Sequence, residues 1–466
     1  MNDIGLIGLA VMGQNLALNI ARKGYSVSVY NRTSERTKEF IENKVKEEKI
    51  FPYYDIKSFA ESLNKPRKII LMVKAGKPVD DMINELLPYL EKGDLIIDGG
   101  NSYFGDTSRR IEELKDKGIL YLGMGVSGGE YGALYGPSLM PGGTKEAYNL
   151  VEDILLKISA QTELGPCCSY VGNGSAGHFV KMVHNGIEYA IMQAIAEIYD
   201  FLRKVLNLSS NEIACIFEEW NRGELNSYLM EISYKIMRFK DYETGKNLVE
   251  LILDEAEQKG TGKWTAQTSL DLGIPTPSLN IAVEARIMSY FKKERVKLSK
   301  WVKKIYPKIF FDKDKVIEDL KRSLLFSIFT SFSQGIWLIS EASNVFKYDI
   351  DLLEVLRIWK GGCIIRAKIL DFLRDILRDN NENVNLLAHE KSFSFLLDKF
   401  NSIKNIINLS KDFYIPTPVL SSSLEYFLSM IEENLPANLI QAQRDFFGAH
   451  TYKRVDKEGI FHTEWE

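Results

Sequence analysis

The sequence predicts two unlike domains, an α/β domain built on a parallel sheet and then a large all-α domain, with a short tail behind them. Three observations lead to this prediction. The chain has 466 residues, which is more than one hydrophobic core usually supports. Short apolar segments alternate with helical patterns in the first third, and long helical patterns fill most of the remainder. We therefore expect domains at residues 1–176 and 177–435 and a tail at residues 436–466.

The strands expected in the first domain are short, apolar and separated by helical patterns, which is typical of a parallel sheet. They are predicted at Asp3–Leu9, Tyr25–Tyr30, Lys68–Val73, Leu95–Asp98 and Leu120–Val126. Turns rich in glycine or asparagine follow two of them, at residues 98–102 and 127–129. Because ligands bind at the carboxyl ends of such strands, we expect these turns to border a cleft.

The second domain carries a weak internal repeat. Trp220 and Gly223 of one helical stretch recur as Trp359 and Gly362 of a later one. Any two amphipathic helices share part of such a pattern, but the matched tryptophan and glycine favour an internally duplicated domain. The tail is rich in aromatic residues, which favours docking on a protein surface over disorder.

The composition, with 45% hydrophobic and 26% charged residues, is that of an ordinary soluble protein. A net charge of -4 and the lack of a basic stripe argue against nucleic acid as a partner. No apolar run reaches membrane-spanning length, and no basic leader precedes the first strand. The cysteines lack metal or redox spacing, and the adjacent Cys167 and Cys168 are interpreted as reduced thiols in a strand. We expect a cytoplasmic protein with no metal site and with no nucleic-acid or membrane partner.

The segment from Gly8 to Gly13 lies where the first strand should meet the first helix. Gly8 permits a tight turn, Gly13 lets helix and strand pack closely, and the small Ala10 replaces the usual central glycine. A helix beginning near Gly13 would direct free N–H groups and its positive dipole end at a pyrophosphate. Although glycines often mark only a turn, the surrounding strand–helix–strand unit predicts a Rossmann-type dinucleotide site. Its contacts would be Gly8, Leu9, Ala10, Val11, Met12 and Gly13.

The end of the second predicted strand indicates which dinucleotide is bound. An NAD site would have Asp or Glu there for the ribose 2′-hydroxyl, whereas this chain has Asn31, Arg32 and Thr33. A guanidinium and a hydroxyl can receive a 2′-phosphate that a carboxylate would repel. The alternative is a solvent-exposed loop arginine, but the position of Arg32 favours NADP.

A polar stripe occupies one face of the apolar helix predicted after Gly177. Lys181, His184, Asn185 and Glu188 are spaced i, i+3, i+4 and i+7, so they lie along one side. The stripe could be an ordinary solvated surface, but its flanks are too apolar for a freely exposed helix. We therefore expect the stripe to face the cleft. There a lysine with a lowered pKa can act as a base and a carboxyl with a raised pKa as an acid.

Several longer motifs occur in order along the chain. They are Gly8–Gly13, Asn31–Thr33, Val73–Gly76, Asp98–Ser102, Val126–Glu130, Gly177–Tyr189, Gln258–Thr265 and Arg444–His450. Together these motifs resemble those of the decarboxylating 6-phosphogluconate dehydrogenases, and the resemblance extends over essentially the whole chain. It implies NADP-dependent oxidation and decarboxylation of 6-phosphogluconate to ribulose 5-phosphate, CO2 and NADPH. It also implies that Lys181 is the general base, that Glu188 is the acid, and that no metal is needed.

The resemblance further implies a set of binding residues. Contacts to the sugar acid would be made by Asn101, Ser127, Gly128, Gly129, His184 and Asn185. Contacts near its phosphate would be made by Tyr189, Lys259, Thr261, Arg286, Arg444 and His450. The cofactor would also meet Val73, Lys74, Ala75 and Asn101. In such enzymes the tail enters the neighbouring subunit, so the resemblance implies a homodimer with shared active sites.

The chain departs from the usual family pattern in a few places. Tyr131 and Leu134 stand where a Glu and an Arg are common, and Ala190 and Ile191 replace a Gly-Asp pair. These departures put details of loop and helix packing in doubt. Two other functions are compatible with parts of the pattern. One is another NAD(P)-dependent β-hydroxyacid dehydrogenase, although those chains are typically shorter and lack the tail. The other is a non-catalytic NADP-binding sensor, against which Lys181 and Glu188 argue.

Overall fold

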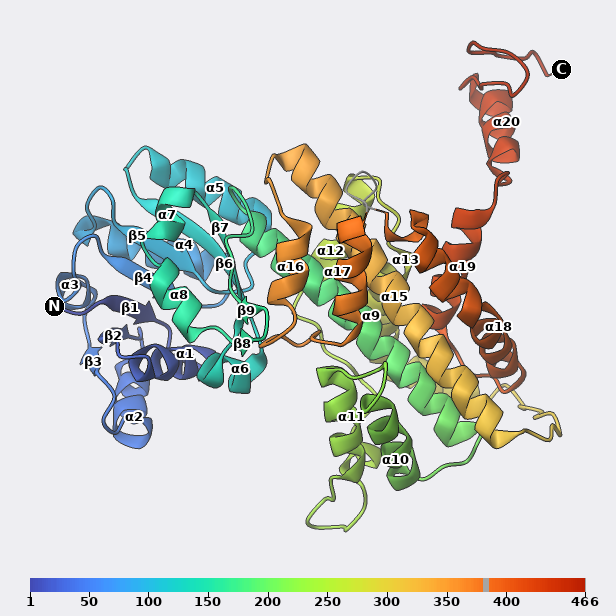
Figure 1. The fold of residues 1–466 in the computed structure, drawn as a ribbon, viewed down its shortest axis with the longest axis horizontal. Coiled ribbons are helices and arrows are strands. Elements are labelled where there is room, and N and C mark those ends of the chain that lie inside the picture. Colours follow the sequence, from blue (N-terminus) through green and yellow to red (C-terminus); the bar gives the residue numbers. More distant parts are fainter. Residues whose placement is uncertain (380–384, 466) are drawn as a thin grey trace.

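The computed structural model describes residues 1–379 and 385–465 and has the predicted order of an α/β domain and an all-α domain. Figure 1 shows the sheet with its helices at one end of the molecule and a bundle of longer helices beside it. A C-terminal tail projects from the far side of that bundle (Figure 1). The sheet domain and the helical domain therefore meet along one border, from which α9 (Ala176–Lys204) runs into the bundle.

The sheet has seven strands in the order β3-β2-β1-β4-β5-β6-β7. Neighbours from β3 to β6 are parallel, and β7 pairs antiparallel with β6. The strand order reverses between β1 and β4, which is where sheets of this kind bind dinucleotides. The strands are β1 Ile4–Ile7, β2 Val27–Tyr30, β3 Ile50–Tyr53, β4 Lys68–Leu71, β5 Leu95–Asp98, β6 Leu120–Ser127 and β7 Ser138–Gly143, and a separate pair is formed by β8 Gln161–Thr162 and β9 Gly165–Pro166.

All five predicted strands are present, and the structure adds β3 and β7 to the main sheet. β3 contains Pro52 and lies at the edge of the sheet, where a residue without an N–H is tolerated. β7 also contains a proline and two glycines, so its sequence lacks the usual strand pattern. Cys167 and Cys168 are buried free thiols, but they follow β9 and belong to no continuous strand, and only Cys168 forms an isolated parallel β-bridge, with Leu139 of β7.

Helices cover both faces of the sheet because alternate residues of each strand point to opposite sides. Leu95 and Ile97 of β5 belong to one apolar cluster with α1, α2, α7 and α8, and Ile96 belongs to a second with α3, α4 and α5. The helices of this domain are α1 Val11–Arg22, α2 Ser34–Lys44, α3 Ile56–Glu61, α4 Lys77–Leu86, α5 Phe104–Lys115, α6 Gly129–Tyr135, α7 Lys145–Asn149 and α8 Glu152–Ile158.

Two long helices, α9 and α15, lie side by side in the helical domain, and shorter helices surround them (Figure 1). By length and composition α15 could cross a membrane, and among the described residues it alone has this property. Here 89% of its most apolar window is buried by other parts of the protein. The helices after α9 are α10 Ser210–Asn221, α11 Tyr228–Arg238, α12 Thr261–Asp271, α13 Pro277–Tyr290, α14 Lys292–Ser299, α15 Lys313–Phe346, α16 Leu352–Ile358, α17 Ile369–Asp379, α18 Glu390–Asp412 and α19 Pro418–Ile431.

The arrangement of these helices agrees with the predicted duplication. Helices α9 to α13 and α15 to α19 follow one another in the same order, each series beginning with its longest helix. Helix α12 packs on α9 as α18 packs on α15, while α13 and α19 pack on each other and each touches both long helices. Trp220 lies near the end of α10, and Trp359 directly follows α16. The helical domain thus consists of two similar halves around a central pair of helices.

The tail, residues 436–465, begins with α20 (Ala437–Gly448), although the sequence there showed no strong helical periodicity. Beyond α20 the chain folds back, and Tyr452 pairs with Phe461 in a short antiparallel bridge. Figure 1 shows that this part of the chain stands apart from the rest of the molecule. Several of its apolar side chains, Leu439, Ile440 and Phe447 among them, are exposed.

Candidate active site

Helix α9 begins against the middle of β6 and the carboxyl end of β5. A Cβ on Gly177 would lie 2.0 Å from the carbonyl oxygen of Gly123, so only glycine allows the helix to approach the sheet this closely. The next residue, His178, is buried, and its ring forms hydrogen bonds with Thr107 Oγ1 at 2.6 Å and the carbonyl of Asp98 at 3.0 Å. Burial lowers the pKa of His178, so its ring is neutral. These contacts fix the start of the helix that carries the polar stripe.

Lys181 lies one turn into α9 and is 6% exposed. Gly125 of β6 leaves room for it, because a Cβ there would come within 2.5 Å of the Lys181 Cβ. Its Nζ is 3.4 Å from His184 Nδ1. Burial lowers the pKa of Lys181, although the nearby Glu188 and Cys363 act in the opposite direction. Burial disfavours the charged form of an amine, so the neutral form, which can accept a proton, is more accessible here than in an exposed lysine.

His184 and Asn185 connect the sheet to α12 through a chain of hydrogen bonds. Ser127 Oγ, at the end of β6, lies 3.1 Å from His184 Nε2, and His184 Nδ1 lies 3.0 Å from Asn185 Oδ1. The amide nitrogen of Asn185 donates to Thr261 Oγ1 at 3.2 Å. Burial, with a smaller contribution from Lys181, holds the pKa of His184 well below its ordinary value, so the ring is neutral. The predicted stripe therefore lies inside the protein and faces the border of the two domains.

Glu188 lies at the other end of the stripe, about 10 Å along the helix from Lys181. Its Oε2 is 3.8 Å from His184 Nδ1. Burial raises the pKa of Glu188, and the positive charges of Lys181 and Arg286 oppose this. The carboxyl is thus shifted toward its protonated form, which can donate a proton.

Four predicted phosphate-end residues come together near Glu188. The guanidinium of Arg286 lies over the Tyr189 ring, 3.5 Å from its centroid, and donates to the carbonyl of Glu257 at 3.1 Å. Thr261 is the first residue of α12, and Lys259 lies exposed just before it. Helices α9, α12 and α13 therefore contribute basic and hydroxyl groups to one end of the stripe.

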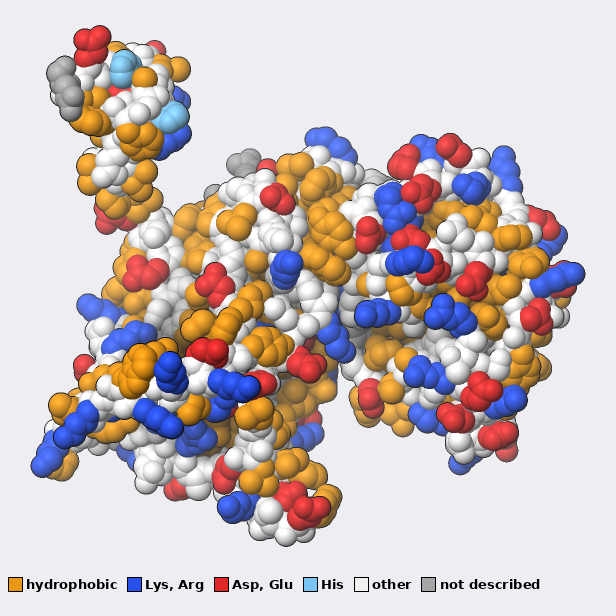
Figure 2. All heavy atoms as spheres, turned by 180° about the vertical axis from the view of Figure 1, so that it is seen from behind, with side chains coloured by type: hydrophobic (Ala, Val, Ile, Leu, Met, Phe, Trp, Pro, Cys, Tyr) orange, Lys and Arg blue, Asp and Glu red, His pale blue; other side chains and the backbone are white. Residues whose placement is uncertain are grey.

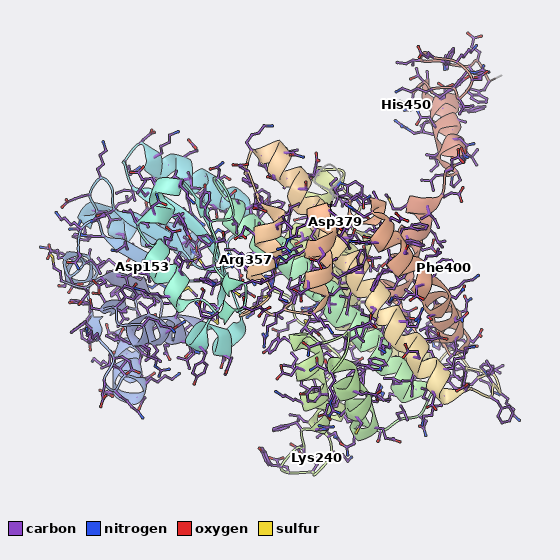
Figure 3. The ribbon with its side chains drawn as sticks, viewed as in Figure 1. Asp153, Lys240, Arg357, Asp379, Phe400 and His450 are labelled. Atoms are coloured by element: carbon purple, nitrogen blue, oxygen red, sulfur yellow. The ribbon has the colours of Figure 1, made fainter. Side chains whose placement is uncertain are left out.

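The structure does not bring the other two predicted phosphate-end residues, Arg444 and His450, to this place. Both are exposed in the tail, and Figure 3 shows His450 on the projecting segment, far from the border of the two domains. Within a single chain, the stripe therefore lies beside four of the predicted phosphate-end residues, whereas Arg444 and His450 lie elsewhere.

A loop of the second helical half holds the Ser-Gly-Gly turn that follows β6. Gly128 has a φ of +126°, and a Cβ there would lie 2.4 Å from the carbonyl oxygen of Gly362. The backbone N–H of Ile364 donates to Ser127 Oγ at 3.4 Å. Two of the three predicted ligand-binding residues of this turn, Ser127 and Gly128, are therefore positioned by residues far away in the sequence.

The same loop contributes Trp359 and Cys363, which the sequence did not identify as site residues. The Trp359 ring packs edge-on against His184 with centroids 5.6 Å apart, and the Cys363 thiol donates to the Trp359 carbonyl at 3.1 Å. In the sequence, Trp359 and Gly362 stand out only as members of the internal repeat. The repeat was the one sequence signal that pointed to this loop, but it could not show that the loop packs against the stripe.

The loop between β1 and α1 has the geometry that a dinucleotide needs. Gly8 has a φ of +101°, and a Cβ on Gly13 would lie 1.8 Å from the Gly8 carbonyl oxygen. The prediction that α1 begins near Gly13 was slightly off, because it begins at Val11 with Ala10 as its N-cap. No side chain caps this end, so its backbone N–H groups are available to a pyrophosphate. Leu9 N–H donates to Asn31 Oδ1 at 3.0 Å and ties this loop to the end of β2.

The residues after β2 suit an anionic group on the ribose. Arg32 is exposed and forms no ion pair with any described residue, and Thr33 is the N-cap of α2 without a side-chain cap. The Asn31 amide donates to the Thr33 carbonyl at 3.1 Å and orders the turn. No carboxylate takes the place that would bind a ribose hydroxyl, so these residues fit a 2′-phosphate.

A buried ionic network fixes the loops after β4 and β5. The Asp98 carboxylate accepts hydrogen bonds from Ser102 Oγ at 2.6 Å and Tyr121 OH at 3.1 Å. Arg110, which is 1% exposed, reaches Asp98 at 3.5 Å and the Gly76 carbonyl at 3.1 Å. The predicted cofactor residues on these two loops are Val73, Lys74, Ala75 and Asn101, and the network holds the loops on the same edge of the sheet as Gly8.

The departures from the family pattern lie beside the stripe and the Ser-Gly-Gly turn without entering them. Tyr131 is 71% exposed on α6, and Leu134 packs on the core of the sheet domain. Ala190 and Ile191 follow Tyr189 and are buried in the helical core. In the part of the chain that the structure describes, no group of three or more His, Cys, Asp or Glu could hold a metal ion.

The chain matches two family models. The model described as the NAD binding domain of 6-phosphogluconate dehydrogenase matches residues 3–172, and that described as 6-phosphogluconate dehydrogenase, C-terminal domain, matches residues 177–465. The chain is 50% identical to an NADP(+)-dependent, decarboxylating 6-phosphogluconate dehydrogenase of Bacillus subtilis, with 99% of both chains covered. It is 51% identical to a decarboxylating 6-phosphogluconate dehydrogenase of Salmonella typhimurium, again over 99% of both chains.

A solved structure of Plasmodium falciparum 6-phosphogluconate dehydrogenase has a similar fold along its whole length. The TM-score is 0.95 and the sequence identity is 45%, with 99% of this chain and 100% of that chain covered. The Plasmodium enzyme is described in its apo form, in complex with its cofactor NADP+ and in complex with its substrate 6-phosphogluconate.

Proposed function

The chain belongs to the 6-phosphogluconate dehydrogenase family, and we propose that it oxidises and decarboxylates 6-phosphogluconate with NADP. The products are ribulose 5-phosphate, CO2 and NADPH. The observation that carries this proposal is the stripe on α9. Lys181 and Glu188 lie at its two ends. Burial lowers the pKa of Lys181 and raises the pKa of Glu188, and both shifts favour the neutral form of the side chain. The reaction begins by removing a proton and ends by adding one, so it needs such a base and such an acid.

Lys181 acts first, as the base. Its neutral amine accepts the proton of the C3 hydroxyl while the hydrogen on C3 departs as a hydride. NADP, when bound, supplies the acceptor for that hydride. The product of oxidation is a 3-keto acid, and its C1 carboxylate leaves as CO2 because the new carbonyl takes up the electron pair. Protonated Lys181 stabilises the negative charge that develops on the C3 oxygen.

Glu188 acts last, as the acid. Loss of CO2 leaves an enediol, and Glu188 protonates the carbon that becomes C1 of ribulose 5-phosphate. A carboxyl with an ordinary pKa would have lost its proton at neutral pH, whereas burial raises the pKa of Glu188. No step requires a metal, because Lys181 polarises the carbonyl.

The remaining polar residues hold the substrate between these two groups. The sugar acid contacts Asn101, Ser127, Gly128, Gly129, His184 and Asn185. Its phosphate lies near the helix end where Tyr189, Lys259, Thr261 and Arg286 gather. Support for this placement comes from the hydrogen bonds that join Ser127 to His184 and Asn185 to Thr261, because they place both sets of residues along one line.

NADP binds across the carboxyl edge of the sheet. The start of α1 would hold its pyrophosphate, and Asn31, Arg32 and Thr33 would bind its 2′-phosphate. The proposed contacts are Gly8, Leu9, Ala10, Val11, Met12, Gly13, Asn31, Arg32, Thr33, Val73, Lys74, Ala75 and Asn101.

A second copy of the chain completes each site. Arg444 and His450 lie on a tail that stands apart from its own chain and exposes apolar side chains, which Figure 2 shows in orange. In a homodimer with twofold symmetry each tail can bury this surface on the partner and bring both residues to the phosphate end of the partner's stripe. We propose residues 1–176, 177–435 and 436–466 as the nucleotide-binding, helical and exchanged units of a cytoplasmic enzyme.

Product analysis tests the proposed function directly. Purified protein is supplied with 6-phosphogluconate and NADP, and NADPH and CO2 are measured together. We expect one CO2 for each NADPH, and faster turnover with NADP than with NAD. Turnover of 3-hydroxyisobutyrate without turnover of 6-phosphogluconate would identify a different β-hydroxyacid dehydrogenase. Nucleotide binding without CO2 release would identify a sensor.

A further inference from the structure

The tail is organised around one buried carboxylate, that of Asp445. It is the buried residue of α20, with 0% of its surface exposed. Its Oδ1 accepts hydrogen bonds from the Thr451 N–H and from His462 Nδ1, both at 2.9 Å. Its Oδ2 accepts them from the Thr463 N–H at 3.1 Å and from the Trp465 indole N–H at 2.9 Å. Two oxygens that accept four hydrogen bonds are fully used, so this carboxylate joins α20 to the end of the chain.

Gln441 lies one helical turn before Asp445 and has bonds at both ends of its amide. Its oxygen accepts a hydrogen bond from the Arg444 guanidinium at 3.1 Å. Its nitrogen donates to the carbonyl of Thr451 at 2.6 Å. One side chain thus connects Arg444 to the turn that carries His450.

The turn that carries His450 is strained. Ala449 and Thr451, on either side of it, have φ values of 49° and 63°, which few residues other than glycine adopt. A β-branched residue such as Thr451 is especially disfavoured there. The backbone N–H and carbonyl of Thr451 are bound by Asp445 and Gln441, respectively. These two side chains therefore hold a conformation that the turn would not otherwise keep.

We propose that Asp445 and Gln441 are positioning residues that fix Arg444 and His450 for the substrate phosphate. This inference rests on the proposed function, in which the tail completes the site of a partner subunit. Neither Asp445 nor Gln441 touches the substrate. They act through the direction of the Arg444 guanidinium and the conformation of the Ala449–Thr451 turn.

Three residues near the C-terminus, His462, Thr463 and Trp465, share this positioning role. His462, Thr463 and Trp465 donate to the carboxylate of Asp445, and through it they act on the turn at His450. Burial opposes ionisation of Asp445, but the hydrogen bonds from His462 and its neighbours lower its pKa to about 2. The carboxylate therefore stays charged throughout the pH range in which the enzyme would work.

Three variants of the full-length enzyme test the proposal. Asp445→Asn keeps the size of the side chain but replaces one acceptor oxygen with a donor. Gln441→Met keeps its length but removes both hydrogen bonds. Gln443→Met is the matched control, because Gln443 is an exposed glutamine of the same helix. For each variant we would measure kcat, the KM values for 6-phosphogluconate and NADP, and the mass of the dimer by sedimentation.

We expect Asp445→Asn to raise the KM for 6-phosphogluconate about tenfold, and Gln441→Met about threefold, since the first disturbs bonds to a charged group. kcat should change less than KM, and the KM for NADP and the dimer mass should match those of Gln443→Met. An unchanged KM for 6-phosphogluconate in both variants would overturn the proposal. So would a parallel rise of both KM values with loss of the dimer, because that would indicate a merely structural role.

Arg444→Ala distinguishes failure of this inference from failure of the proposed function. If Arg444→Ala raises the KM for 6-phosphogluconate while Asp445→Asn and Gln441→Met do not, the tail binds the phosphate without needing its positioning residues. If Arg444→Ala also leaves the KM unchanged, the tail does not bind the phosphate, and that part of the proposed function is wrong.

Discussion

The stripe on α9 and the tail both carry residues assigned to one active site, but only the stripe is enclosed by its own chain. Lys181 and His184 are 6% and 0% exposed, and glycines of the sheet leave room for the helix that bears them. Arg444 and His450 are exposed on a segment that stands apart (Figure 1). The stripe is fully enclosed once the single chain folds. The tail also folds, but its exposed residues contact no other described part of the same chain that would form a binding site.

This difference suggests a division of roles, with proton transfer in the stripe and binding of the substrate phosphate by the tail. Burial within the chain moves the pKa values of Lys181 and Glu188 without help from a partner, so the pKa shifts that the proposed base and acid need arise on folding alone. An exposed arginine and histidine need no shift in pKa to bind a phosphate, and they can be supplied from another chain. We therefore expect changes in the stripe to act on kcat and changes in the tail to act on the KM for 6-phosphogluconate.

The largest effect should follow from Lys181→Met, which fills similar space but cannot accept a proton. We expect kcat to fall by about 10²- to 10⁴-fold, the range typical of lost general base catalysis. NADP binding, measured by fluorescence titration, should remain. Lys204→Met is the control, because Lys204 is an exposed lysine at the other end of α9 that pairs with Asp200. A loss of NADP binding along with kcat would show that Lys181 supports the fold rather than the reaction.

Glu188→Gln should lower kcat by about 10²-fold and alter the pH profile of kcat/KM. Lys181 must lose its proton to act, which gives the rising acidic limb, and Glu188 must keep its proton, which gives the falling alkaline limb. The charge of Glu188 raises the pKa of Lys181 against the effect of burial. At the acidic limb, however, Glu188 still holds its proton and carries no charge, so Glu188→Gln should leave that limb near its wild-type pH and abolish the alkaline limb.

The comparison would fail if variants of the tail produced the same change in the pH profile. Arg444→Ala is the tail variant to compare with Glu188→Gln, because Arg444 lies outside the stripe and shows no contact with it within one chain. The pH profile of kcat/KM for Arg444→Ala should keep both limbs at the wild-type pH values, and only the maximum value of kcat/KM should be lower.

Part of this architecture could be predicted from the sequence because the signals are local. The glycine loop, the five predicted strands and the stripe each depend on residues within a few turns of one another, where spacing determines which side chains share a face. The carboxyl end of β6 could be placed at the cleft for the same reason. β3 was missed because an edge strand tolerates Pro52, which is otherwise a signal against a strand.

The rest could not be predicted, since it depends on which distant segments pack together. Nothing near Ser127 indicates that Ile364 donates to its hydroxyl or that the Gly362 carbonyl fits against Gly128. The helix of the tail was missed for a different reason. Its apolar residues include Leu439 and Ile440, which are exposed in the single chain, so they do not form the one-sided pattern of a helix packed on its own domain.

Mixed dimers test whether the two regions belong to different chains. When Lys181→Met and Arg444→Ala subunits are unfolded together and refolded, half of the dimers should contain one of each. Each mixed dimer would have one site with an intact stripe and an intact partner tail. With 6-phosphogluconate kept well below the raised KM of Arg444→Ala, activity should return to about a quarter of the wild-type value, because one site in two is restored in half of the dimers. No recovery would mean that each tail serves its own chain.

The smallest effect on kcat is expected from a change that touches neither region. Arg32→Glu puts a carboxylate beside the proposed 2′-phosphate, so the KM for NADP should rise about tenfold while the KM for NAD changes little. Because Arg32 lies beyond β2, far in sequence from both the stripe and the tail, kcat at saturating NADP and the KM for 6-phosphogluconate should stay the same. Steady-state kinetics with both nucleotides would measure these constants, and Arg36→Glu on α2 is the control for charge alone. Equal losses with NADP and NAD would remove the phosphate-binding role from Arg32.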